Sequence, residues 1–125
     1  MYGDQPCDNQ ITVCTAQGRL TFPEIQNHVI DFSTRQVTRR VLCDLSRATV
    51  ADLTASEIEE IIELISRQVA GRSGGKAAII ARAGVDYGLA RMFGTFAEIA
   101  DLPIKVRVFR TPEIATQWLQ EPPGS

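Results

Sequence analysis

The chain has 125 residues, 44% of them hydrophobic, which suits a single domain with one core. Its 13 basic and 15 acidic residues give a formal net charge of -2, and this balance argues against a nucleic-acid partner and an anionic membrane surface. No apolar stretch approaches the roughly 20 residues that cross a bilayer, so we do not expect an integral membrane protein.

Both ends of the chain are polar. Residues 1–9 and 121–125 are expected to be flexible tails around one domain of residues 10–120. The first residues lack the apolar core of a signal peptide, and Cys7, Cys14 and Cys43 have no CxxC spacing. Such cysteines are typical of free thiols in a reducing compartment, so the expected location is the cytoplasm.

The domain begins with a strand and a helix. Residues 11–16 predict the strand. The helix begins at Thr21, because the Thr21 hydroxyl and the Glu24 carboxylate are spaced as a capping box that satisfies unpaired backbone N–H groups. Its buried stripe is expected at helical spacing and comprises Phe22, Ile25 and Val29.

A second strand and helix follow. The apolar run of residues 40–45 predicts a central strand that is covered on both faces. Thr54 and Glu57 form a second capping box, and the helix that they begin ends at Gly71. One face of this helix is apolar and comprises Ile58, Ile61, Ile62, Ile65 and Val69.

The second half of the chain repeats the alternation. Residues 76–81 predict a third apolar strand, residues 86–100 a helix, and residues 104–109 a strand with one exposed face. Thr111 followed by Pro112 begins the last helix. The apolar side of this helix comprises Ile114, Ala115, Trp118 and Leu119.

Strands and helices thus alternate throughout the domain. Parallel neighbours in a sheet need crossover connections, and helices supply them. We therefore predict an α/β fold with a mostly parallel β-sheet of four to five strands and alternating helices.

Three stretches resemble the SpoIIAA-like proteins, a bacterial group related to STAS domains and in part grouped as STAS/SEC14-type. These are residues 41–48 with the helix at Thr54, residues 75–81 with 87–93, and residues 106–110 with 114–119. The resemblance implies a compact βα sandwich without enzymatic activity. It also implies a function in protein binding.

The resemblance breaks down at the position of a known switch. In STAS anti-sigma-factor antagonists, a serine after the central strand controls the binding of a kinase-like partner through its phosphorylation. When Asp44, Leu45 and Ser46 are set on the matching Asp-Leu-Ser, Leu53 replaces this serine and Ala55 replaces the glycine beside it. The resemblance therefore does not extend to the phosphorylation switch.

Catalytic and metal-binding patterns are weak. A nucleophile–base site would need Cys43 to meet the only histidine, His28, whereas a thiol in a central strand is usually buried and inert. One histidine and three scattered cysteines do not supply four metal ligands. The Gly-rich residues 71–76 follow a helix and precede a strand, the reverse of a phosphate-binding loop. We expect no enzyme, no metal and no cofactor.

Polar side chains follow two of the predicted strands. In open parallel sheets, ligands bind beyond the carboxyl ends of the strands. A binding rim is therefore expected there, comprising Asp44, Ser46, Arg82, Asp86, Tyr87 and Arg91. The alternative is structural: Asp44 caps a turn, Asp86 caps a helix and Arg91 is a solvated charge.

The helix of residues 86–100 has more apolar surface than one buried face needs. It also contains Gly88 and Gly94, each of which costs about 1 kcal/mol relative to alanine inside a helix. Close packing on the sheet or on a neighbouring helix would explain both glycines. The alternative is a contact surface around Met92 and Phe93 for a second subunit, a partner protein or an apolar ligand.

The sequence thus predicts a non-catalytic SpoIIAA-like domain that binds another protein or forms a homodimer. The dimer would use an exposed sheet edge or the Met92–Phe93 surface. The alternative function is that of a small-molecule or lipid carrier. An enzyme is the third and least supported possibility.

Overall fold

The computed structural model describes residues 2–7, 11–34, 39–68 and 75–121, which form one five-stranded sheet and four helices. The strands are β1 (Tyr2–Cys7), β2 (Ile11–Arg19), β3 (Arg40–Thr49), β4 (Gly75–Ile80) and β5 (Ile104–Phe109). The helices are α1 (Phe22–Thr34), α2 (Ala55–Gln68), α3 (Val85–Ile99) and α4 (Pro112–Gln120). β1 is antiparallel to β2 and the other strand pairs are parallel, which confirms the predicted α/β class.

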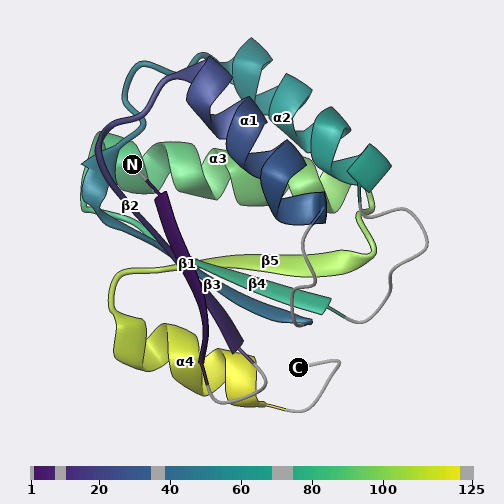
Figure 1. The fold of residues 1–125 in the computed structure, drawn as a ribbon. Helices are drawn as coiled ribbons and strands as arrows, with labels where there is room; N and C mark the ends of the chain where they lie inside the picture. The colour runs from purple at the N-terminus through teal and green to yellow at the C-terminus, as the bar shows by residue number, and fades with distance from the viewer. Residues whose placement is uncertain (1, 8–10, 35–38, 69–74, 122–125) are drawn as a thin grey trace.

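The helices cover the two faces of the sheet unequally (Figure 1). The strand order β1-β2-β3-β4-β5 is the order of the chain, so each crossover between parallel strands moves one place in the same direction. Right-handed crossovers of this kind place their helices on the same face. Accordingly, α1, α2 and α3 cover one face, and α4, which follows the last strand, packs on the other against β3, β4 and β5.

β3 contributes to the core on both faces, as predicted for a central strand. Leu42 points toward α4, and the neighbouring Cys43 and Leu45 point toward the three-helix layer. The core on the α4 face comprises Ile11, Leu42, Ala78, Ile80, Ala115, Trp118 and Leu119. These side chains are at most 8% exposed, and on the three-helix face Ile79 and Ala81 are 8% and 4% exposed, so the sheet is shielded from water on both faces.

Local sequence signals place the starts of the helices correctly. In the first capping box, the Thr21 backbone N–H donates to Glu24 Oε1 at 3.0 Å and the Glu24 N–H donates to Thr21 Oγ1 at 3.4 Å. In the second, the Thr54 N–H donates to Glu57 Oε1 at 3.0 Å and the Glu57 N–H donates to Thr54 Oγ1 at 3.1 Å. Both helix starts are therefore stabilised by residues that the sequence alone identifies.

The N-terminal segment differs from the prediction. Residues Tyr2–Cys7 form β1 rather than a flexible tail, with pairs that run from Tyr2–Ala16 to Cys7–Ile11. An edge strand is held by backbone hydrogen bonds along one side, so it can form without the apolar alternation that identifies strands in a sequence. Edge strands also tolerate proline, here Pro6.

β3 is longer than the predicted strand of residues 40–45. Its pairing with β4 ends at Asp44–Ile80, whereas its pairing with β2 continues through a bulge to Thr49–Arg19. Beyond Asp44 the strand has a neighbour on one side only and is less apolar. The apolar run therefore marks the doubly paired part of β3 and not its end. The predicted helix end at Gly71 lies outside the described residues.

The buried ammonium of Lys76 joins β4 to the end of α4. Lys76 is 4% exposed, and its Nζ donates to the carbonyl oxygens of Trp118 and Glu121 at 3.0 Å each. It also lies 4.9 Å from the centroid of the Trp118 ring. The last carbonyls of a helix lack partners within the helix and form its negative end, so a cation there is well placed.

The apolar side of α4 is narrower than predicted. Ala115, Trp118 and Leu119 are buried, but Ile114 is 54% exposed. Ile114 lies about 100° around the helix from Ala115, which turns it away from the sheet. The described end of the predicted C-terminal tail, Glu121, caps α4 through its N–H, which donates to the Trp118 carbonyl.

We expect Lys76→Met to lower the free energy of unfolding by about 2 kcal/mol, because two charge-assisted hydrogen bonds are lost while an unbranched side chain is kept. Urea denaturation measures this change. The control is Lys105→Met on β5, an exposed neighbour of Lys76 in the register, for which we expect less than about 0.5 kcal/mol. Equal losses in the two variants would contradict the role of Lys76.

We also expect the effect of Lys76→Met on the free energy of unfolding to depend on pH. Burial lowers the pKa of Lys76 from its ordinary value of 10.5. Between the folded-state pKa and 10.5, the Lys76 side chain binds more protons in the unfolded chain than in the folded chain, so its contribution to the free energy of unfolding rises with pH in that window. The difference in free energy of unfolding between the wild type and Lys76→Met, measured in urea at a series of pH values, should therefore rise with pH in that window, because the other titrating groups, Cys14 included, contribute to both proteins.

Candidate functional site

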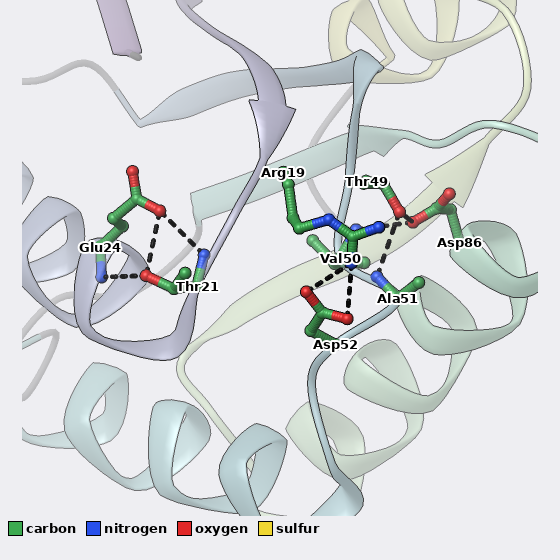
Figure 2. A network of polar contacts seen from close by, with 8 residues as sticks. All are labelled: Arg19, Thr21, Glu24, Thr49, Val50, Ala51, Asp52 and Asp86. Atoms are coloured by element: carbon green, nitrogen blue, oxygen red, sulfur yellow. Dashed lines mark hydrogen bonds and ion pairs between the residues drawn. The ribbon is translucent and has the colours of Figure 1, made fainter.

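β2, β3 and β4 end on the same side of the sheet, and α1, α2 and α3 begin there, because the strands are parallel and their crossovers return the chain each time. We call this region the carboxyl edge and define it as residues 19–24, 49–57 and 81–87. Figure 2 shows its polar contacts, which join the end of β2, the loop between β3 and α2, and the first turn of α3.

An exposed ion pair joins the β3–α2 loop to the end of β2. Arg19 Nη1 donates to both carboxylate oxygens of Asp52, at 2.7 and 2.6 Å, and the two side chains are 65% and 50% exposed (Figure 2). This contact raises the pKa of Arg19 through the hydrogen bond and the charge of Asp52. A backbone hydrogen bond also joins the ends of β2 and β3, because the Leu20 N–H donates to the Thr49 carbonyl at 3.0 Å.

The Asp86 side chain joins the β3–α2 loop to α3 through two hydrogen bonds. One carboxylate oxygen, Oδ1, accepts from the Val50 backbone N–H at 2.6 Å and from the Thr49 hydroxyl at 3.0 Å (Figure 2). The residue before α3, Gly84, has a φ of 85° and no side chain to cap the helix. The Asp86 carboxylate in the first turn places a negative charge near the positive end of α3. It thus stabilises both the loop and the helix start.

An apolar cluster supports the loop from below. Its buried members are Ala16, Leu20, Ala48 and Val50. Leu53, which the sequence resemblance sets on the switch serine of the STAS antagonists, packs against this cluster. The neighbouring Thr54 caps α2 through its hydroxyl. The partly buried Leu53 therefore contributes to the apolar packing that supports the loop.

The structure does not bring the predicted rim together. Asp44 follows Leu42 by two residues on β3, so its side chain lies on the α4 face, and its Oδ1 accepts from the Ser46 N–H at 2.9 Å. Asp86, Tyr87 and Arg91 belong to α3, on the opposite face. The prediction considered the ends of the strands but not the face on which each side chain lies.

The other predicted rim residues have separate surroundings. Arg82 is exposed in the loop after β4, and Arg91 is exposed on α3. Tyr87 packs against the core cluster of Ile79, Ala81 and Ala90, and the Arg110 guanidinium lies 5.2 Å from the centroid of its ring. The structural alternatives therefore describe Asp44 and Asp86 better than a shared ligand site does.

The strand order gives a further reason against a ligand crevice at this edge. Such crevices form where the strand order reverses and neighbouring crossovers leave on opposite faces. The four described parallel strands follow one another without reversal, and their three crossover helices share a face. The carboxyl edge accordingly consists of helix starts and loops beside one another.

Met92 and Phe93, the proposed contact surface on α3, have different surroundings. Both residues are half-buried, and Phe93 packs against the core cluster of Ile79, Ala81 and Ala90, to which Met92 does not belong. Among the described residues, a Cβ added at Gly88 would meet no atom within 4 Å, and one at Gly94 would meet only Val108 Cγ2 at 4.0 Å. The close packing that would explain Gly88 is therefore absent from the described structure.

The sequence does not predict a contact between His28 and Cys14, which the structure places together. From the sequence, a nucleophile–base site would pair His28 with Cys43, but His28 Nε2 on α1 lies 3.0 Å from Cys14 Sγ on β2. Cys14 is directly opposite Cys43 in the register of β2 and β3. The register of two strands and the rotation of a helix decide this meeting, and neither is visible in the sequence. Within the described residues, no group of three or more His, Cys, Asp or Glu side chains could hold a metal ion.

Comparison with known proteins identifies the architecture. Neither the protein families nor the curated proteins give a match. Among solved structures, the unphosphorylated form of the anti-sigma factor antagonist SpoIIAA matches with a TM-score of 0.62, and 96% of each chain is covered. The chain has the fold of SpoIIAA. At 11% sequence identity, this likeness shows the STAS-like fold alone.

The fold agrees with the family resemblance expected from the sequence. SpoIIAA matches over nearly the whole chain, so the likeness includes the sheet, the helices and the carboxyl edge. None of the described helices is both long and apolar enough to cross a membrane.

We expect Asp86→Ala to lower the free energy of unfolding by about 2 kcal/mol, because the Val50 N–H and the Thr49 hydroxyl lose a charged acceptor. Asp52→Ala, which removes an exposed ion pair from the same loop, should have a smaller effect. Hydrogen exchange at Val50 and urea denaturation measure both changes. Unchanged exchange at Val50 in Asp86→Ala would show that the bridge does not hold the loop.

Proposed function

We propose that this chain is a non-catalytic binding domain that binds a protein partner at its carboxyl edge. The observation that supports it most is the match to SpoIIAA over 96% of both chains. A protein named an anti-sigma factor antagonist acts on another protein, and it has the same arrangement of sheet and helices. We propose that this chain likewise acts by binding another protein, whose identity can differ from that of the partner of SpoIIAA.

The carboxyl edge is the surface that suits this function. Five exposed residues, Ala51, Asp52, Thr54, Ala55 and Ser56, follow one another closely along the loop and the start of α2. Below them, the capping box, the Asp86 bridge and the apolar cluster satisfy the polar groups and fix the backbone. Asp52 and Thr54 already contact Arg19 and the start of α2, so the side chains of Ala51, Ala55 and Ser56 are the ones available for contacts that the fold itself does not require.

We further propose that binding does not depend on a phosphate at the position of the STAS switch. That position is Leu53, which has no hydroxyl group and packs against the apolar cluster. The neighbouring Thr54 already uses its hydroxyl as the cap of α2. A location in the cytoplasm and a homodimer through the sheet edge or the Met92–Phe93 surface stay predictions, to be tested together with the partner.

The experiment compares two arginine variants of the full chain by native mass spectrometry after gentle purification from the source organism. Ser56→Arg changes an exposed residue of α2 at the carboxyl edge, and Gln117→Arg changes an exposed residue of α4 on the other face. Both replace a neutral polar side chain with the same cation. We expect Ser56→Arg to weaken the complex by roughly tenfold or more and Gln117→Arg to leave it intact.

The result separates the possible functions. A hetero-complex that is lost only in Ser56→Arg supports the proposal, whereas loss in Gln117→Arg alone would place the interface on the α4 face and overturn it. A homodimer that responds to neither variant would favour self-association elsewhere. A tightly held small molecule without a protein partner would favour the alternative of a small-molecule or lipid carrier.

A further inference from the structure

Three reactive side chains from three elements meet between the sheet and the helix layer. Cys14 is on β2, Cys43 is on β3 and His28 is on α1. The parallel register pairs Cys14 directly with Cys43, and His28 Nε2 lies 3.0 Å from Cys14 Sγ. Both cysteines are thiols in this structure. The proposed binding function uses none of the three.

The placement of the two thiols suits a disulfide. Neighbouring strands are about 4.8 Å apart, and the Cα atoms of a disulfide are usually separated by roughly 4.4–6.8 Å. Cys14 and Cys43 both point into the three-helix layer, because each contacts side chains on that side of the sheet. Their thiols are close enough to share a hydrogen bond.

The two thiols differ in their surroundings. Cys14 is 2% exposed, and the hydrogen bond with Cys43, together with burial, raises the pKa of the Cys14 thiol well above its ordinary range. At neutral pH, Cys14 therefore holds its proton and needs a base before it can act as a nucleophile. His28 is placed to be this base. Cys43 is half-buried, so a small oxidant has access to it first.

We propose that Cys14 and Cys43 form an oxidisable dithiol that hydrogen peroxide converts to a disulfide, with His28 as the base for Cys14. In the first step, the Cys43 thiol gives its proton to solvent, and its sulfur then attacks one peroxide oxygen. The O–O bond breaks, an S–O bond forms, and the released hydroxide takes up a proton as water. Cys43 is then a sulfenic acid, oxidised by the two electrons that reduce the peroxide.

In the second step, His28 Nε2 accepts the proton of the Cys14 thiol, and the Cys14 sulfur attacks the sulfur of the Cys43 sulfenic acid. The S–S bond forms, the S–O bond breaks, and the hydroxide leaves with the proton from His28 as a second water. The balance is two thiols and one hydrogen peroxide giving one disulfide and two waters. A thiol reductant restores the starting state.

The test treats the folded full chain with hydrogen peroxide and follows its mass. We expect the loss of two hydrogen atoms, reversed by dithiothreitol, and a Cys14–Cys43 cross-link in the peptide map. Cys7→Ser is the matched control and should react like the wild type, whereas Cys14→Ser and Cys43→Ser should not form the bond. Circular dichroism confirms that each variant is folded, and Cys14→Ala replaces Cys14→Ser if the latter is not.

A second measurement examines His28 separately. In His28→Gln we expect the disulfide to form roughly 100-fold more slowly, while sulfenic acid accumulates at Cys43 and is trapped by dimedone. Stepwise oxidation of Cys43 to sulfinic acid with Cys14 unchanged would overturn the dithiol, and so would a cross-link that includes Cys7. An unchanged rate in His28→Gln would remove the role of His28 as the base.

Discussion

The sequential order of the parallel strands determines most of this structure. Every crossover from β2 to β5 advances by one strand in the same direction, so α1, α2 and α3 are placed on one face of the sheet. No crossover helix covers the other face, where Leu42, Ala78 and Ile80 would meet water. α4 covers them, and its contacts with the sheet include the buried Trp118 ring and the hydrogen bonds from Lys76.

The same order explains what kind of site the carboxyl edge can be. A sheet whose strand order reverses opens a crevice between crossovers that leave on opposite faces. Here the helix starts and the β3–α2 loop lie beside one another on one side, and their polar groups largely contact each other. Such a surface offers shape and exposed side chains to another protein more readily than it encloses a small molecule.

Features that depend on neighbours along the chain could be predicted, whereas those that depend on register could not. The capping boxes at Thr21 and Thr54 and the alternation of β5 were read correctly, because the interacting residues are close in sequence. β1 has no apolar signal and is held by the backbone of β2. The sequence does not show on which face of the sheet a rim side chain lies, and the structure places Asp44 and Asp86 on different faces. The Cys14–His28 contact needs a helix rotation that no local pattern reports.

The Asp86 bridge has a consequence for the cost of binding. A loop that is mobile when alone must lose conformational entropy when a partner orders it, and this loss is subtracted from the affinity. The β3–α2 loop is already joined to α3 through the Val50 N–H and the Thr49 hydroxyl, and to β2 through Asp52. Much of the ordering of this loop has therefore taken place during folding. A partner that contacts only a small area of the loop loses little of its binding free energy to the ordering of the loop.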